Sequence, residues 1–200
     1  MKSILMSVIL SIIIAVPVFA KQNINVIING EKQYTKEYNI NFNKNDIIPF
    51  SVRHIAEKLG YHVHFNNDTN TLYIIENSRI LYENETLGIG FIAPDECKNN
   101  YYKILENEYD NYTVIQFLDA EMDMLIFSFA YIDLEYWDDE MKESFSIPYS
   151  EIFKNNDTLL LSVSVSDVQY DTNDTEQKNR YLKLLHFKQK ICDNIYTFQY

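Results

Sequence analysis

The dipeptide Asn29-Gly30 is the feature that most constrains the fold, because Asn-Gly between apolar segments is the strongest short-range signal for a tight β-hairpin. Before it, Ile24, Val26 and Ile28 alternate with polar residues in the two-residue period of a half-buried strand. After it, residues 32–40 are expected to form a return strand and a connection. The sequence therefore predicts an antiparallel pair of strands near the start of the folded chain.

A short helix and a second hairpin are predicted to complete this first module. Ser51 can cap the helix, and Gly60 can end it in the left-handed conformation. The apolar face of this helix is formed by Val52, Ile55, Ala56 and Leu59. Residues 63–65 and 71–75 are then predicted as two strands joined by a polar turn. We expect the order hairpin, helix, hairpin.

These pieces resemble the copper amine oxidase-like N-terminal domain, the stalk module of secreted proteins of Gram-positive bacteria. The matching segments occur in the same order as in that family and are residues 24–30, 48–49, 53–66 and 71–74. The resemblance implies a stalk domain over residues 23–76. It implies no oxidase chemistry, because this module is remote from the catalytic domain of the amine oxidases.

His62 and His64 lie two residues apart on a predicted strand, so they point to the same face. Two imidazoles on one face could share a Cu²⁺ or Zn²⁺ ion, but a metal site needs further ligands, and none is identifiable nearby in the sequence. We therefore interpret both histidines as part of a solvent-exposed strand face and His54 as an exposed helix residue. The sequence predicts no metal ion and no cofactor.

The remaining chain, residues 78–200, is predicted to be a second α+β domain. Strands are expected over residues 88–93, 112–118, 124–132 and 158–165. The side chains predicted to share one face of the second strand are Val114, Gln116 and Leu118. The longest helix is expected over residues 174–195, and a short helix within 133–143. The predicted fold class is α+β, with two small domains, each an antiparallel sheet with one or more packed helices.

Parts of this domain resemble a domain of uncharacterised secreted proteins and lipoproteins of clostridia and relatives. The segments that carry the resemblance are residues 90–98, 125–128 and 166–171, followed by a helix that contains Tyr181. The resemblance implies a module fused behind the stalk domain and brings no established activity. It also implies a packing position for Cys97, where the family commonly has tryptophan.

Cys97 and Cys192 are the two cysteines of the chain. Two thiols outside the cell can pair, so we predict Cys97–Cys192 as a candidate disulfide. The alternative is two buried thiols that pack as small apolar side chains. Neither cysteine is predicted to be a nucleophile.

Two acidic groups are candidate sites. The first surrounds Trp137 and consists of Asp133, Glu135, Asp138, Asp139, Glu140 and Glu143. Paired carboxylates beside an aromatic residue would suit glycoside hydrolysis. The second consists of Asp167, Asp171, Asp174 and Glu176, and oxygen-rich loops suit Ca²⁺. We interpret the first as the face of a surface helix and the second as the cap and first turn of the last helix, with Asp174 or Thr175 as the cap.

The first twenty residues have the layout of a secretory signal peptide, with Lys2, an apolar run over residues 4–16, Pro17 and a cleavage site after Ala20. The run is shorter than the roughly 20 apolar residues that a membrane span needs, so we expect cleavage rather than a membrane anchor. The formal net charge is −12 and no basic stripe is present, which argues against binding of nucleic acid or an anionic membrane surface.

The sequence therefore predicts a secreted or cell-surface-associated, non-catalytic protein of the cell envelope. Its partner is expected to be a cell-wall component or a secreted protein, with no nucleic acid and no stable membrane insertion after cleavage. The alternative from another class is a wall-directed hydrolase that uses the acidic residues near Trp137. A third is a dimerising structural protein that associates through exposed sheet edges.

Overall fold

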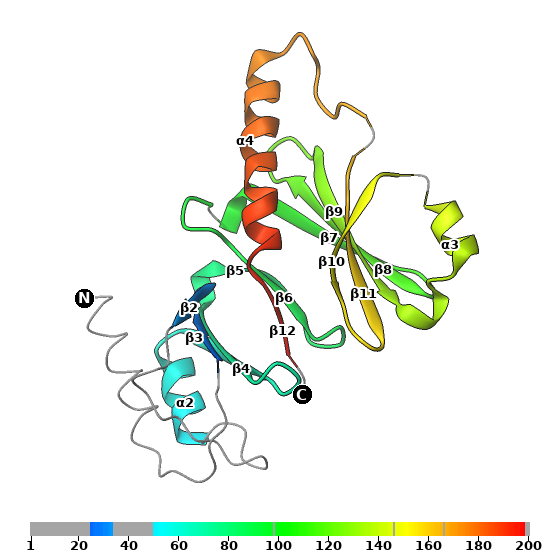
Figure 1. The fold of residues 1–200 in the computed structure, drawn as a ribbon. Coiled ribbons are helices and arrows are strands. Elements are labelled where there is room, and N and C mark those ends of the chain that lie inside the picture. Colours follow the sequence, from blue (N-terminus) through cyan, green and yellow to red (C-terminus); the bar gives the residue numbers. More distant parts are fainter. Residues whose placement is uncertain (1–24, 34–49, 98, 146, 166, 199–200) are drawn as a thin grey trace. The chain divides into compact units, whose positions relative to one another are not determined.

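The computed structural model describes residues 25–33, 50–97, 99–145, 147–165 and 167–198 (Figure 1). Over these residues the protein is a mixed α+β structure with three sheets, mostly antiparallel, and three α-helices, which confirms the predicted fold class. No helix in the described ranges is long and apolar enough to cross a membrane. The predicted signal peptide, residues 1–20, lies outside them.

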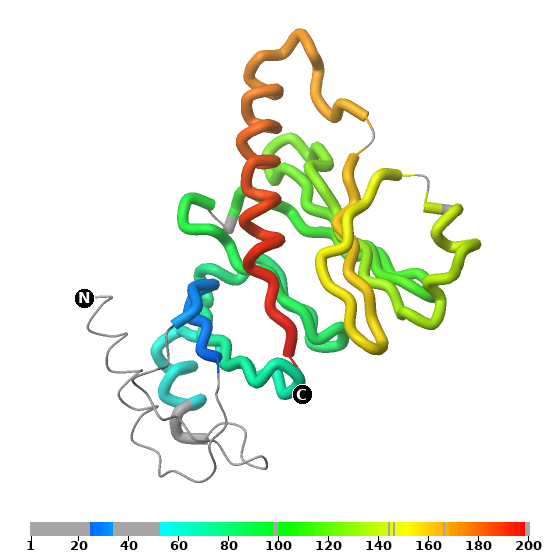
Figure 2. Tube along the Cα trace, in the orientation of Figure 1, coloured from blue at the N-terminus to red at the C-terminus, as the bar shows by residue number. Residues whose placement is uncertain are grey.

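The chain divides into two compact units. Unit 1 comprises residues 1–92 and 194–200, and unit 2 comprises residues 93–193. The division predicted from the sequence lies at residue 77, so the two divisions differ. The reason is that residues 80–92 and the end of the chain form a second sheet of unit 1, and Figure 2 shows the red C-terminal segment returning to it.

The first sheet of unit 1 contains the predicted hairpins. Its strands are β1 (Asn25–Ile28), β2 (Glu31–Gln33), β3 (Tyr61–Asn66) and β4 (Thr71–Glu76), in the order β2-β1-β4-β3. Asn29 and Gly30 have φ angles of 52° and 86°, as a two-residue hairpin turn of the predicted kind requires. Strands β1 and β4 pair in parallel, so this sheet is mixed.

Helix α2 (Phe50–Lys58) lies between the two hairpins and packs against β3. Ala56 is fully buried on the predicted apolar face. Gly60 follows the helix with a φ angle of +82°, which confirms its predicted role at the helix end.

The second sheet of unit 1 is made from segments far apart in the sequence. Its strands are β5 (Ile80–Asn84), β6 (Ile89–Ile92) and β12 (Ile195–Thr197), in the order β12-β6-β5, and the 3-10 turn η2 (Asn77–Arg79) precedes it. The two sheets share an apolar core formed by Tyr73, Ile75, Ile92, Tyr196 and Phe198, with Ile27 and Ile80 packed against it. This second sheet buries the face of β3 and β4 that a single sheet would expose.

Unit 2 is a five-stranded antiparallel sheet. Its strands are β7 (Tyr102–Glu108), β8 (Tyr112–Asp119), β9 (Leu125–Asp133), β10 (Tyr149–Lys154) and β11 (Thr158–Val163), in the order β10-β11-β9-β8-β7. The strands predicted over 112–118, 124–132 and 158–165 are confirmed. Strands β7 and β10 were not predicted, because they are the edge strands and most of their side chains are exposed.

Helix α4 (Thr175–Cys192) covers one face of this sheet. Asp174 caps it by accepting hydrogen bonds from the backbone N–H groups of Glu176 and Gln177, as predicted. The Tyr102 hydroxyl donates to the Leu184 carbonyl oxygen at 2.6 Å, which fixes the helix on the sheet. The helix ends at Cys192 rather than continuing to residue 195, since Ile195–Thr197 form β12. The remaining helical elements of unit 2 are two 3-10 turns, η3 (Asn99–Tyr101) and η4 (Leu134–Tyr136), and the short α-helix α3 (Asp139–Ser144).

Candidate functional site

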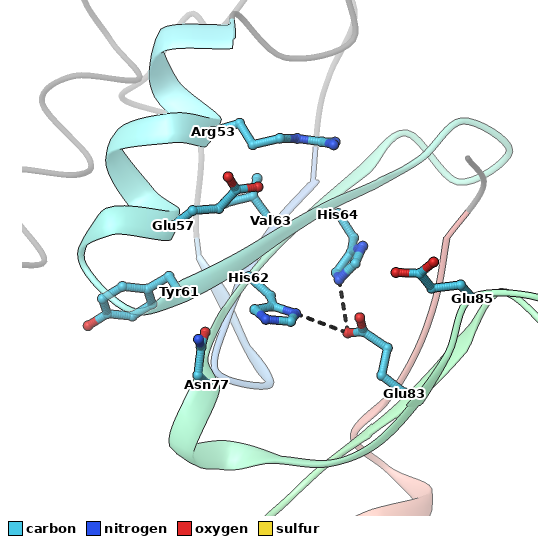
Figure 3. Close-up of a pocket in the computed structure, with 9 residues that line it drawn as sticks. All are labelled: Arg53, Glu57, Tyr61, His62, Val63, His64, Asn77, Glu83 and Glu85. Carbon is cyan, nitrogen blue, oxygen red and sulfur yellow. Dashed lines mark hydrogen bonds and ion pairs between the residues drawn. The ribbon is translucent and has the colours of Figure 1, made fainter.

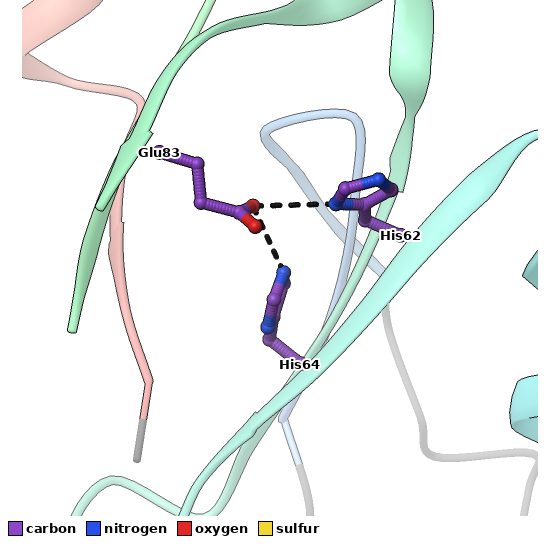
Figure 4. Close-up of side chains that lie close together, drawn as sticks. All are labelled: His62, His64 and Glu83. Carbon is purple, nitrogen blue, oxygen red and sulfur yellow. Dashed lines mark hydrogen bonds and ion pairs between the residues drawn. The ribbon is translucent and has the colours of Figure 1, made fainter. Parts of the chain in front are cut away.

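Three titratable side chains converge in unit 1, and we name them the His–Glu cluster. His62 and His64 project from β3, and Glu83 projects toward them from β5 (Figure 4). Glu83 Oε2 lies 3.0 Å from His64 Nε2 and 3.4 Å from His62 Nδ1. The three ligand atoms all lie within 4.8 Å of one another.

The structure corrects the prediction that both histidines lie on a solvent-exposed face. His64 is buried, with 7% of its surface exposed, whereas the His62 side chain keeps 40%. His64 is buried because the end of the chain returns over it: its ring centroid lies 4.2 Å from that of Phe198 and 5.5 Å from that of Tyr196. The prediction that the two histidines share a face is therefore correct (Figure 4), and the prediction that His64 is exposed is wrong. His54 is exposed, as predicted.

Glu83 is held in place by a third partner, the Tyr196 hydroxyl, which donates a hydrogen bond to Oε2. In the register of the sheet, Glu83 and Tyr196 are both opposite Gly90. A Cβ atom built on Gly90 would lie 2.1 Å from Tyr196 Cζ. The tyrosine ring therefore crosses β6 over Gly90 to reach Glu83, and only glycine leaves room for it.

The environment of Glu83 favours the charged carboxylate. Burial alone would raise its pKa, but hydrogen bonds from His64 and Tyr196 and the nearby imidazoles outweigh burial and lower the pKa to about 2. The side chain is only 14% exposed, so this charge lies in a largely desolvated position. A fixed negative oxygen is thus presented to two imidazole nitrogens.

The His–Glu cluster opens into a hollow of about 280 Å³ (Figure 3). Its lining residues are Arg53, Glu57, Tyr61, His62, Val63, His64, Asn77, Glu83 and Glu85. Three carboxylates and one guanidinium line it, so its charge favours a cation. The partly exposed His62 connects the buried cluster with this hollow.

We expect Gly90→Ala to disrupt the cluster through Tyr196. The added methyl group overlaps the tyrosine ring, so the ring must move away from Glu83 and unit 1 should lose about 1–3 kcal/mol of stability. Hydrogen exchange of peptides from β3 and β5 would measure the loss. The control is the same substitution in a Tyr196→Leu variant, because the leucine side chain does not reach across β6. There the cost of Gly90→Ala should largely disappear. If the losses of stability from the two substitutions simply add, this account is wrong.

A second hollow, which we name the apolar groove, lies in unit 2 and has a volume of about 460 Å³. Its lining residues are Tyr112, Val114, Gln116, Leu125, Ser128, Ala130, Met141, Phe145, Ile147, Val163, Ser164, Val165 and Gln169. Val114 and Gln116 point to the same face of β8, as predicted, while Ile115 and Phe117 point to the buried face on the side of α4. The groove therefore lies on the face of the sheet that α4 leaves open.

Two of the acidic residues near Trp137 have structural contacts in and around α3. Asp138 accepts a hydrogen bond from the Met141 N–H and caps α3, and Asp139 lies 2.9 Å from Lys142 Nζ. Trp137 packs edge-on against Phe145 and Tyr149. Within the described part of the chain, the His–Glu cluster is the one group of three or more His, Cys, Asp or Glu side chains whose ligand atoms come together.

The acidic residues near the start of α4 have the structural roles that we expected. Asp174 is the helix cap, and Asp171 Oδ1 accepts a hydrogen bond from the Asn173 N–H at 2.9 Å. Asp167 is exposed, as is Glu176 in the first turn of the helix. Asp171 and Asp174 thus each use an Oδ1 atom to accept backbone N–H groups of this loop and of the first turn of α4.

Cys97 and Cys192 are not joined by a disulfide in the structure, so the predicted pair is not observed. Cys97 is buried, and burial raises its pKa to about 12. Burial also raises the pKa of Cys192, which lies beside Lys188 and Ser162 at the end of α4. Cys97 therefore matches the alternative of a buried thiol, whereas Cys192 is only partly buried.

Comparison of the chain with family models, with curated proteins and with solved structures finds no match. The resemblance to the stalk domain therefore stays a prediction. Of the residues in the His–Glu cluster, sequence reasoning missed Glu83 and its partner Tyr196. The single local signal was Gly90 inside a predicted strand, because such a glycine often marks the close approach of another group.

Proposed function

We propose that the protein is a secreted, non-catalytic binding protein of the cell envelope and that the apolar groove of unit 2 holds its ligand. The proposal keeps the export signal and the stalk-like first module inferred from the sequence. The observation that carries it is the groove itself: a concave, mostly apolar site with a few polar groups is the usual form of a small-molecule site.

The size and chemistry of the groove define a class of ligand. Its volume of about 460 Å³ lies within the range of roughly 300–1,000 Å³ typical of small-molecule sites. Hydrogen-bonding groups are supplied by Gln116, Ser128, Ser164 and Gln169, and none of the lining residues is charged. An uncharged, mostly apolar molecule with one or two polar groups fits this lining, because a charged ligand would lose its hydration without gaining a partner.

Aromatic side chains give one end of the groove a rigid wall. Phe145 packs edge-on against three aromatic rings, those of Tyr112, Trp137 and Tyr149. It also packs against the apolar core on the groove face, which includes Ala130, Ile132 and Leu159. Ile147 at the rim remains 41% exposed. A rigid wall with an exposed apolar rim favours binding, since little side-chain entropy is lost and apolar surface is covered.

A pair of dyes tests the charge preference of the groove. The neutral apolar dye Nile red should bind the purified chain, and the anionic dye anilinonaphthalene sulfonate should bind more weakly. Ile147→Asp places a charge at the rim without touching the core and should weaken Nile red binding about tenfold. Leu182→Asp is the matched control, because Leu182 is similarly exposed, at 47%, on α4.

The two variants also test the connection with the envelope. The immobilised wild-type chain should retain its partner from wall fractions or secreted proteins. The Ile147→Asp variant should no longer retain this partner, and the Leu182→Asp variant should retain it as the wild type does. Equal binding by all three chains would place the ligand elsewhere on the protein. Turnover of a wall substrate by the chain would contradict the non-catalytic part of the proposal.

A further inference from the structure

We propose that His62, His64 and Glu83 form a binding site for one Zn²⁺ ion in unit 1. The site is separate from the apolar groove and does not depend on the function proposed for it. Zn²⁺ takes imidazole nitrogen and carboxylate oxygen as ligands, and two histidines with one glutamate are a known three-ligand set for this ion.

The distances between the ligand atoms fit a tetrahedral ion. Zn–N and Zn–O bonds of about 2.0–2.1 Å in a tetrahedron place neighbouring ligand atoms roughly 3.3 Å apart. The separations from Glu83 Oε2 to the two histidine nitrogens are 3.0 and 3.4 Å. The ligand nitrogens of His62 and His64 lie within 4.8 Å of each other. A small rotation of the partly exposed His62 ring brings them to the distance that a tetrahedral ion requires.

The ligands are held in place before an ion arrives. Glu83 accepts a hydrogen bond from the Tyr196 hydroxyl, which reaches it because Gly90 has no side chain. The ring of His64 is stacked on Phe198 and buried. Partners that orient the ligands in this way raise metal affinity, because less freedom is lost when the ion binds.

The hollow beside the cluster supplies access and a favourable charge. It reaches the cluster from the side of His62, and Glu57 and Glu85 outnumber Arg53 along its lining (Figure 3). An ion held by three protein ligands keeps a fourth position, which can take water from the hollow. The carboxylates raise the local concentration of cations and favour entry.

The competing account is that a proton, not a metal, joins these groups. In that account a histidine N–H donates to Glu83 and the network only stabilises the contact between the two sheets. The two accounts predict different responses to Zn²⁺. A metal site must bind one Zn²⁺ ion, and its affinity for Zn²⁺ must fall when either histidine is removed. A purely structural network predicts neither result.

Titration of the full, untagged chain with Zn²⁺ by isothermal calorimetry tests the proposal. We expect one ion per chain, and no comparable binding of Mg²⁺ or Ca²⁺, which prefer oxygen ligands. His62→Gln should weaken Zn²⁺ binding by at least about tenfold, because a ligand is lost. His62 is partly exposed, so this variant should keep its fold; the matched control His54→Gln replaces an exposed histidine of the same unit and should bind as the wild type.

Nuclear magnetic resonance identifies the ligands independently of affinity. Zn²⁺ should shift the imidazole signals of His62 and His64 and leave those of His54 and His186 in place. The proposal fails if the wild-type chain takes up no Zn²⁺, if His62→Gln binds as tightly as the wild type, or if the signals of His54 or His186 move instead. None of these outcomes bears on the apolar groove, whose tests use other variants.

Discussion

Replacing Asp119 with asparagine is expected to destabilise unit 2 by about 3 kcal/mol or more, because it breaks a buried ion pair and leaves unmatched donors. Asp119 is fully buried at the end of β8, and both of its oxygens accept hydrogen bonds from the Arg180 guanidinium. Oδ1 also accepts the Glu121 N–H at 2.8 Å. This residue therefore joins helix α4 to the β8–β9 turn, and an amide nitrogen in place of one oxygen would face an N–H group.

The same pair predicts how the stability of unit 2 depends on pH. Burial by itself would raise the pKa of Asp119, but the hydrogen bonds from Arg180 and Glu121 lower it below its ordinary value. A carboxyl group whose pKa is lower in the folded state than in the unfolded state stabilises the fold. This contribution is fully present above the pKa of the unfolded state, which is near 4. It is lost as the pH falls through the pKa of the folded state. The difference between wild type and Asp119→Asn should therefore be largest at neutral pH and shrink in acid.

Trp137 is the only tryptophan of the chain and lies in unit 2, so its fluorescence can follow unfolding of this unit in urea. Lys103→Ala is the matched control, because it removes an exposed ion pair near the same turn. In this pair Lys103 Nζ lies 2.8 Å from Asp123 Oδ1. An exposed pair contributes no more than about 1 kcal/mol. Equal losses in the two variants would show that the Asp119–Arg180 pair is not a special support of the fold.

The parts of the fold that could be predicted are those that one segment determines by itself. The turn at Asn29-Gly30 needs two positive φ angles, and Asp174 needs only its own helix to cap. The central strands β8, β9 and β11 are apolar enough to be predicted alone. In each case the physical cause lies within a few residues of the effect.

The parts that could not be predicted depend on distant partners. Strand β12 has only three residues and becomes a strand because β6 is there to pair with it, so the sequence favoured a continued helix. Strands β7 and β10 expose most of their side chains and lack the alternation of a half-buried strand. Tertiary pairing overrides local preference at all three.

The His–Glu cluster shows the same limit at a site. The His-x-His spacing predicted a shared face for His62 and His64, which is a local property of a strand. Glu83 is 19 residues from His64, and Tyr196 is 113 residues from Glu83. No spacing rule connects residues so far apart, so the histidines could be found in the sequence and their partners could not.

Removing the Tyr196 side chain should strongly destabilise unit 1. Tyr196 is fully buried, and its ring lies against Tyr73, His64 and Phe198 in the core between the two sheets. Truncating an aromatic side chain in such a core typically costs about 3–5 kcal/mol, because apolar contacts are lost and a cavity remains. Tyr196→Ala should therefore release β12 and expose the buried face of β3.

Hydrogen exchange measured peptide by peptide can separate the two units. Tyr196→Ala should speed exchange in the peptides of β3, β4 and β6 and leave those of β8, β9 and β11 unchanged, since the latter belong to unit 2. Tyr196→Phe is the matched variant: it keeps the ring and removes only the hydroxyl that donates to Glu83. It should cost about 1.5–3 kcal/mol, the usual value of a hydrogen bond to a charged group.

The contrast between these two variants decides what the C-terminal strand contributes to the cluster. If the ring carries most of the stability, Tyr196→Phe should retain the fold of unit 1 while Glu83 loses one of its three partners. Zn²⁺ binding by Tyr196→Phe should then be weaker than in the wild type by about tenfold, the usual effect of losing a group that orients a ligand. Identical exchange in Tyr196→Ala and the wild type would instead show that β12 is dispensable, and the burial of His64 would need another cause.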